Sequence, residues 1–270
     1  MIQEQESKTK SVLSLSHVNF IYPGENGGVT ALESINLDIP EGEFLCVLGP
    51  SGCGKTTLLK IMAGFLRPTS GQARMDGELI QGPDWHRGVI FQSPPLYPWL
   101  SVQDNIAFGL KMRKYPKSER NLLVEKYIDL VGLKGFENSK PYELSGGMKQ
   151  RVSLARTLVN QPRILLMDEP FGALDALTRQ NMQDLVRKIW KETGNTVLLI
   201  THDVDEALAL ATRTIVLSGR PGRILNEFHT SFTHRILKGE EQVEYLLEYR
   251  ELKEKILQTI RCQHTAADNG

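Results

Sequence analysis

The chain has 270 residues, 40% of them apolar, and its 32 lysines and arginines balance 32 aspartates and glutamates. This length suits one large domain or two modest ones, and the charge balance gives no overall positive field to attract nucleic acid. Cys46, Cys53 and Cys262 lack metal-ligand spacing, as is typical of a reducing compartment. The first residues are polar and acidic, and no run approaches the ~18 apolar residues of a membrane helix. We expect a cytosolic protein that reaches a membrane only through a partner.

The N-terminal part predicts a small antiparallel layer. Residues 1–11 are expected to form a loose tail, and residues 13–20 and 35–39 alternate between polar and apolar, as half-buried strands do. Tyr22 ends the first of these strands. Its ring can stack on a purine or pack within the turn, and the sequence leaves both interpretations open.

A glycine-rich stretch follows the apolar run 44–48 and precedes a predicted helix that stops near Gly64. Its spacing, G-x-x-x-x-G-K-T, is that of a phosphate-binding loop. The glycines let backbone N–H groups turn toward an anion, and the helix N-terminus adds partial positive charge. Lys55 is placed to reach the β- and γ-phosphates, and the Thr56 hydroxyl to bind Mg²⁺. The loop predicts a nucleoside triphosphate site made by Gly49, Pro50, Ser51, Gly52, Cys53, Gly54, Lys55, Thr56 and Thr57.

The next segment combines a strand with a proline-rich loop. Residues 88–92 predict a strand that ends in Gln92, whose amide oxygen can bind Mg²⁺. Residues 93–100 contain three prolines, which exclude a helix, and four large apolar residues, which need a surface to pack against. Two interpretations stay open: these apolar side chains belong to the core, or the loop between Pro94 and Leu100 docks another protein.

Residues 101–160 have helical spacing of apolar residues, with Ser101 and Ser118 as predicted N-caps. A break at 141–144 precedes a further helix. Its capped N-terminus with two glycines is a potential anion site, although such a sequence is also a common turn: Ser145, Gly146 and Gly147.

Beyond residue 162, buried apolar strands alternate with helices, and the strands are 164–167, 196–200 and 214–217. This alternation predicts a parallel sheet with right-handed crossovers, in which ligands bind beyond the carboxyl ends of the strands. Asp168, Glu169 and His202 follow two of these strands, so we expect them on the same edge as the phosphate-binding loop. From 240 onward an amphipathic helix is expected, followed by disorder at 265–270.

Phosphoryl transfer needs mainly positioning and charge neutralisation, and the predicted edge supplies both. Asp168 is expected to hold Mg²⁺ directly or through water, and Glu169 to polarise a water aimed at the γ-phosphate. A histidine at a strand end is more often structural, but the neighbouring strand ends favour a role for His202 at the γ-phosphate or the water. The predicted catalytic residues are Glu169, His202, Lys55 and Gln92, and the predicted metal ligands are Thr56, Gln92 and Asp168.

In this order, the motifs resemble those of the ATP-binding subunit of an ATP-binding-cassette transporter. Residues 144–150 (LSGGMKQ) resemble the family's signature sequence, 164–169 (ILLMDE) its Walker B strand with the catalytic glutamate, and 173–175 (ALD) its D-loop. Three further residues fall at family positions: Gln92 at the Q-loop, His202 at the switch histidine and Tyr22 at the adenine-stacking position.

The resemblance implies an α/β fold. Its P-loop NTPase core has a mostly parallel sheet, an antiparallel β layer at the N-terminal side and an inserted α-helical subdomain. The implied division is a flexible tail (1–11), the ATPase core (12–92 and 161–230), the helical subdomain with the signature (93–160) and a C-terminal helical tail (231–270).

The resemblance also implies ATP and Mg²⁺ as cofactors and a head-to-tail dimer, with a second copy or a paralogous ATPase subunit. Ser145 and Gly147 of one subunit would close over ATP bound to the other, and hydrolysis would reopen the dimer. Integral membrane permease subunits would dock near Pro94 to Leu100, supplied by a solute-binding protein. This places the chain peripherally at the cytoplasmic face of the plasma membrane, with no nucleic-acid partner.

Within the family, residues 98–100 and 220–224 resemble importers of nitrate, sulfonate, taurine and bicarbonate type, and thiamine-precursor importers look similar. Two other functions compete. A soluble ATP-binding-cassette protein acting on nucleic acid or ribosomes usually carries a coiled coil, zinc cysteines or tandem cassettes, and this sequence has none. A metabolic kinase would leave the LSGGMKQ segment without a role.

Overall fold

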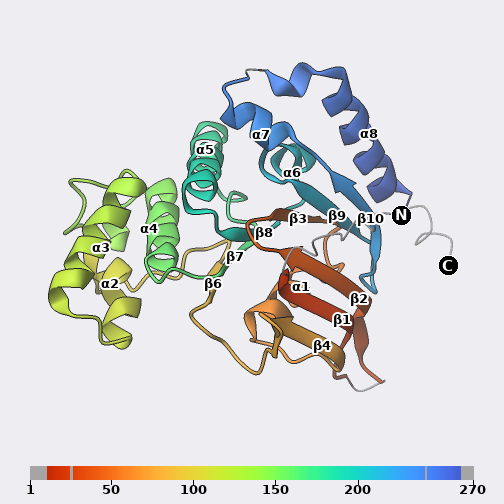
Figure 1. Ribbon diagram of the computed structural model, residues 1–270, viewed down its shortest axis with the longest axis horizontal. Helices are drawn as coiled ribbons and strands as arrows, with labels where there is room; N and C mark the ends of the chain where they lie inside the picture. The colour runs from red at the N-terminus through yellow and green to blue at the C-terminus, as the bar shows by residue number, and fades with distance from the viewer. Residues whose placement is uncertain (1–10, 25–26, 241, 263–270) are drawn as a thin grey trace, which may run out of the picture.

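The computed structural model describes residues 11–24, 27–240 and 242–262. Two sheets and several helices make up this part of the chain (Figure 1). The strands are β1 Ser11–Tyr22, β2 Val29–Pro40, β3 Phe44–Leu48, β4 Ser70–Met75, β5 Glu78–Leu79, β6 Arg87–Ile90, β7 Ile164–Asp168, β8 Thr196–Ile200, β9 Arg213–Leu217 and β10 Ile224–His229. The α-helices are α1 Lys55–Ala63, α2 Val102–Met112, α3 Lys117–Leu130, α4 Gly146–Leu158, α5 Ala176–Thr193, α6 Val204–Leu210, α7 Phe232–Leu237 and α8 Leu247–Arg261.

The predicted combination of a parallel sheet with an antiparallel layer is confirmed. The larger sheet has the order β10-β9-β3-β8-β7-β6, and its strands are parallel except for the antiparallel edge strand β10. The smaller sheet has the order β2-β1-β4-β5 and is antiparallel. The tail predicted for 1–11 lies outside the described residues except for Ser11, which begins β1, and the predicted disorder at 265–270 lies outside them entirely.

Strand β3 is buried on both faces, which explains its unbroken apolar sequence. Phe44, Cys46 and Leu48 pack into one core with residues of α4, α5 and α6, whereas Leu45 and Val47 face a second core. The second core also contains the apolar side chains of α1 and of the antiparallel sheet. Helix α1 is therefore held between the two sheets, and the loop that precedes it is fixed from both sides.

Helices α2, α3 and α4 gather at one end of the molecule, away from the antiparallel sheet (Figure 1). Ser101 caps α2 as predicted, since its hydroxyl accepts the Asp104 backbone N–H at 3.2 Å. The predicted cap Ser118 is wrong: α3 begins at Lys117 with Pro116 as its N-cap residue, and Ser118 lies in the first turn. Proline has a fixed φ and lacks an N–H, so it is tolerated at a helix start.

The described part of the chain contains no helix with both the length and the apolar character needed to cross a bilayer.

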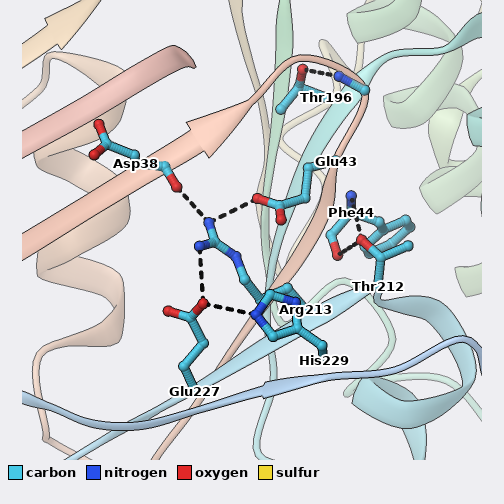
Figure 2. A network of polar contacts seen from close by, with 9 residues as sticks. Asp38, Glu43, Phe44, Thr196, Thr212, Arg213, Glu227 and His229 are labelled. Atoms are coloured by element: carbon cyan, nitrogen blue, oxygen red, sulfur yellow. Dashed lines mark hydrogen bonds and ion pairs between the residues drawn. The ribbon is translucent and has the colours of Figure 1, made fainter. Parts of the chain in front are cut away.

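The amino ends of the central strands are joined by a half-buried ionic network (Figure 2). Arg213 begins β9, and its guanidinium donates to Glu43 Oε2 at 2.8 Å and to the Asp38 carbonyl of β2 at 2.5 Å. A second nitrogen donates to Glu227 of β10 at 3.3 Å, and Glu227 also pairs with His229. The side chains of Arg213 and Glu43 are 11% and 14% exposed. This network ties the antiparallel sheet to the parallel one at the end opposite the phosphate-binding loop.

Arg213→Met should lower the free energy of unfolding by about 3 kcal/mol, because it leaves Glu43 as a largely buried carboxylate without its cation. Burial raises the pKa of the Glu43 carboxyl and Arg213 opposes that rise, so the substitution raises this pKa further. The neutral form then relieves the penalty, and the loss should be larger at about pH 8 than at about pH 5. Chemical denaturation at the two pH values measures this difference.

Arg223→Met is the matched control, because its ion pair with Glu33 at 2.7 Å is exposed on both sides. We expect a change within about 0.5 kcal/mol, since exposed ion pairs contribute little. Equal losses in the two variants would contradict a special structural role for Arg213.

Candidate nucleotide-binding site

The parallel register brings the predicted site residues to one edge of the larger sheet. Strand β3 pairs with β8, and β8 pairs with β7, so that Asp168 lies beside Ile200. The glycine-rich loop follows β3, Asp168 ends β7, and His202 follows β8 by two residues. Carboxyl ends of parallel strands lie at the same edge, and there the three segments meet.

Two glycines of the loop lie where a side chain would have no space. Gly54 is the N-cap residue of α1 with φ 102°, and a Cβ there would lie 2.7 Å from the Ala31 carbonyl oxygen of β2. A Cβ on Gly49 would lie 2.8 Å from Cys53 Sγ. Both a left-handed φ and the lack of space exclude larger residues at position 54. The antiparallel sheet thus fixes the loop from outside.

Lys55 is held inside the loop. Its side chain is buried, and Nζ donates to the carbonyl oxygens of Gly49 at 2.8 Å and Pro50 at 2.9 Å. Cys53 Sγ lies 4.0 Å from the same nitrogen. The ammonium therefore has a fixed position at the centre of the loop, where an incoming anion would exchange with these carbonyls.

Hard oxygen ligands lie next to the loop. Thr56 Oγ1 donates to Asp168 Oδ1 at 3.2 Å. Burial raises the pKa of the Asp168 carboxyl, and the bond from Thr56 opposes the rise. Among the described residues no group of three or more His, Cys, Asp and Glu side chains could hold a metal by itself. A hydroxyl with one carboxylate suits Mg²⁺, which takes most of its ligands from phosphates and water.

Glu169 is paired with His202. The Glu169 Oε2 to His202 Nδ1 distance is 3.4 Å, and the histidine side chain is 67% exposed. Glu169 has φ 45°, a left-handed conformation that is uncommon for residues with a Cβ and that its N–H bond to the Ile200 carbonyl at 3.0 Å helps to hold. A Cβ on Gly172 would lie 3.4 Å from Gln92 Nε2 and 3.9 Å from Glu169 Oε2. The amide and the carboxylate thus flank the same glycine.

A pocket of about 450 Å³ opens over the loop. Tyr22 lies at its edge with 39% of its surface exposed, and its hydroxyl shares a 3.0 Å hydrogen bond with Thr57 Oγ1. The hydroxyl thus anchors Tyr22 to Thr57 while the residue lines the pocket, and stacking of its ring on a purine stays a prediction. The lining residues are Tyr22, Val29, Ala31, Ser51, Gly52, Gly54, Lys55, Thr56, Thr57, Glu169 and Arg220.

Residues 32–172 match the family model described as ABC transporter. The chain belongs to the ABC transporter family. It is 54% identical over 221 residues to the taurine import ATP-binding protein TauB of Roseobacter denitrificans, covering 82% of each chain. It is 49% identical over 229 residues to the protein of that name from Escherichia coli O6:K15:H31, covering 85% of this chain and 88% of that one.

Solved ABC cassettes share the fold. A dimeric structure of the cassette MJ0796 in a post-hydrolysis state with ADP and Pi has a TM-score of 0.71 and 33% identity, and the match covers 80% of this chain and 98% of that one. The cbiO1 protein of Clostridium perfringens has a TM-score of 0.75 and 26% identity, covering 92% and 99%. This ABC protein is therefore a nucleotide-binding ATPase, as the sequence motifs predicted.

Some predicted residues of the ABC protein lie away from the pocket. Among the described residues, the pocket lining excludes Ser145 and Gly146, although Ser145 caps α4 by accepting the Met148 N–H at 3.3 Å. Gly147 is buried, and a Cβ there would lie 2.5 Å from Thr178 Cγ2 at the start of α5. The signature segment therefore packs against α5, and its contact with a nucleotide stays a prediction.

Arg220 lies at the pocket although no motif of the sequence predicts it there. It follows β9 and belongs to the 220–224 segment that was used only to assign a family subgroup. In the structure it lines the nucleotide pocket, and its guanidinium Nη2 lies 3.5 Å from the Gly52 carbonyl oxygen. Only the fold brings this distant segment to the loop, and residue spacing gives no signal for it.

A larger hollow, of about 860 Å³, lies along α2 and α3. Lysines, arginines, aspartates and glutamates line it together, without the glycine-rich backbone of a phosphate site. The smaller pocket over the loop therefore remains the nucleotide site of the ABC protein.

Nucleotide binding should slow alkylation of Cys53. Its side chain is 1% exposed beneath the loop, and burial raises the pKa of its thiol, so alkylation requires the loop to open. ATP at ten times its Kd should suppress that opening about tenfold. Mass spectrometry of each cysteine against time measures the rates, with the exposed Cys262 as an internal control. Equal Cys53 rates with and without ATP would contradict this loop geometry.

Proposed function

We propose that this chain hydrolyses ATP to power an importer of taurine or a closely related small oxyanion. Hydrolysis is supported by the Glu169–His202 pair, which lies beside the Thr56–Asp168 pair at the phosphate-binding loop. Relatives named for taurine import, about half identical over more than four fifths of the chain, support the substrate class. Nitrate, bicarbonate and thiamine-precursor import remain the alternatives within the family.

Binding begins at the loop. Loop N–H groups and Lys55 surround the phosphates, and the Lys55 ammonium exchanges the Gly49 and Pro50 carbonyls for β- and γ-phosphate oxygens. Tyr22, anchored through Thr57, stacks on the adenine. The proposed contacts are Tyr22, Ser51, Gly52, Gly54, Lys55, Thr56 and Thr57, with Gly49, Pro50 and Cys53 shaping the loop.

Thr56 and Asp168, with Gln92 as a further oxygen ligand, would hold Mg²⁺, which would neutralise charge on the β- and γ-phosphate oxygens. Burial favours the neutral form of Asp168, and the hydrogen bond from Thr56 favours its anion. The hydroxyl therefore opposes, without cancelling, the rise in pKa that burial causes in this carboxyl.

Glu169 acts as the general base. Its carboxylate accepts a proton from the water that attacks the γ-phosphorus, the bond to the β-phosphate oxygen breaks, and ADP and phosphate leave. His202 Nδ1 lies 3.4 Å from this carboxylate. A neutral imidazole has a single N–H, so His202 either orients the carboxylate through Nδ1 or donates from Nε2 to the γ-phosphate. The exposed face of His202 is open to a nucleotide or to a partner subunit.

A second copy, or a paralogous subunit, completes the site. The capped N-terminus of α4 can bind an anion, and Gly147 beside the cap packs against α5. We assign this helix end to a nucleotide held by the opposing subunit. The dimeric structure of the MJ0796 cassette with ADP and Pi supports a dimer, and we propose that its subunits are arranged head to tail. We assign 12–92 and 161–230 to the ATPase core, 93–160 to the helical subdomain and 231–270 to a C-terminal helical tail.

Some apolar residues of the proline-rich loop pack against the core, and others remain exposed. Leu96 packs against the core, and Tyr97 is held by Asn105, which bonds both its N–H and its carbonyl. Trp99 remains 69% exposed. We assign the surface around Trp99 to docking on membrane permease subunits at the cytoplasmic face, with a solute-binding protein beyond them, and the cbiONQ complex of cbiO1 supports this assembly.

Glu169→Gln should lower ATP turnover by about 10² or more, because the amide cannot accept the proton, while leaving ATP affinity within about threefold. The variant should accumulate as an ATP-bound dimer. Steady-state phosphate release, nucleotide titration and light scattering measure the three quantities. Turnover near the wild-type rate would exclude Glu169 as the base, and a monomer at saturating ATP would contradict the dimer.

Uptake of labelled taurine in cells that carry the complete importer should fall to background with Lys55→Ala or Glu169→Gln in this subunit. Both variants remove ATP-driven steps and leave the permease unchanged. Unlabelled taurine should compete with the label in wild-type cells, whereas nitrate and bicarbonate should not. Strong inhibition of labelled taurine uptake by nitrate or bicarbonate would assign the importer to that solute, and a taurine uptake that does not depend on Lys55 and Glu169 would contradict the proposed function.

A further inference from the structure

The segment after β9 lies against the phosphate-binding loop. Residues 218–223 form a closed turn in which the Ser218 hydroxyl accepts the Arg223 N–H at 2.8 Å and donates to the Pro221 carbonyl at 2.6 Å. The Ser218 N–H also donates to the Arg223 carbonyl at 2.8 Å. These bonds fix the turn internally, so that Arg220 projects from a rigid support.

The same turn is attached to the antiparallel sheet. The Gly222 N–H donates to the Ala31 carbonyl at 2.9 Å, and the Gly222 carbonyl accepts the Glu33 N–H at 3.0 Å. A Cβ on Gly222 would lie 2.2 Å from the Cys53 carbonyl oxygen, so the turn touches the backbone of the phosphate-binding loop. Only glycine permits this approach. The turn and the loop therefore keep a fixed mutual position.

Arg220 extends from this support into the nucleotide pocket. Its Nη2 lies 3.5 Å from the Gly52 carbonyl oxygen, a weak bond that uses one of five guanidinium N–H donors. The pocket thus contains two cations, Lys55 inside the loop and Arg220 at its rim. Guanidinium groups bind phosphate oxygens in pairs, with charge-assisted bonds stronger than the bond to a carbonyl.

We infer that Arg220 is a second phosphate-binding cation, which contacts the phosphate chain of the bound nucleotide from the rim of the loop. The inference rests on the nucleotide site proposed above. Arg220 exchanges its weak bond to Gly52 for bonds to phosphate oxygens, and it strengthens binding of ADP as well as ATP because it lies beside the loop backbone that cradles the inner phosphates.

The chain supplies a matched control in the same turn. Arg223 is three residues away and equally charged, but its guanidinium pairs with Glu33 at 2.7 Å and does not line the pocket. Arg223→Gln therefore removes the same charge from the turn without removing a phosphate contact. A general effect of net charge or of turn stability would appear in both variants.

The experiment titrates a fluorescent ATP analogue, with unlabelled ATP and ADP as competitors, into wild type, Arg220→Gln, Arg220→Lys, Arg223→Gln and Lys55→Ala. Arg220→Gln should lower the affinity for ATP and for ADP about tenfold, because a charge-assisted pair of hydrogen bonds is lost. Arg220→Lys should recover part of the loss, and Arg223→Gln should match wild type. Raising the salt concentration should reduce the difference in nucleotide affinity between wild type and Arg220→Gln, because salt screens the charge of the guanidinium.

Each other outcome is decisive. Arg220→Gln within twofold of wild type, with Lys55→Ala weakened, overturns the role of Arg220 and leaves the proposed function intact. Equal losses in Arg220→Gln and Arg223→Gln, with matching drops in nucleotide-free melting temperature, assign the turn a structural role and also overturn it. Failure of wild type to bind ATP would contradict the proposed function itself.

Discussion

The site depends on the parallel pairing of β3 with β8 and of β8 with β7. This pairing places the ends of three buried strands at one edge of the sheet. The loop, the Asp168–Glu169 dipeptide and His202 therefore lie close together although they are far apart in sequence. A slip of one residue would turn the buried side chains to the opposite face and separate Asp168 from Thr56. Burial on both faces of β3 opposes such a slip, because every residue of the strand is in one core or the other.

The loop itself depends on a second constraint, the close approach of two backbones. Ala31 of the antiparallel sheet approaches Gly54, and Gly222 of the turn after β9 approaches Cys53. The phosphate-binding loop is thus confined from both flanks before any nucleotide arrives. Preformed N–H groups lose little freedom on binding an anion, which is how a short glycine-rich loop binds phosphate strongly.

Residues near in sequence made much of this fold predictable. The unbroken run 44–48 predicted a buried strand, and Asp168 and Glu169 lie at the end of a strand as expected. The loop spacing predicted a glycine-rich turn before α1, and its phosphate-binding role stays a prediction. The prediction of Ser118 as an N-cap was wrong because a serine before a helical pattern is typical of an N-cap. In the structure Pro116 is the N-cap residue, and α3 begins at Lys117. The position of Arg220 could not be predicted, because its partner Gly52 lies 168 positions earlier in the chain. A pattern of spacing within one segment contains no information on contacts between segments so far apart.

The positions of the two cations explain why the pocket uses both. Lys55 is already satisfied by two loop carbonyls, so a phosphate must replace those bonds and the net gain is the difference between them. Arg220 gives up only a long bond to one carbonyl, and it does so from an exposed position. Lys55 therefore fixes the position of the phosphate as well as adding to affinity, since its location is set in advance. Arg220 contributes mainly to affinity, since it replaces the weaker bond.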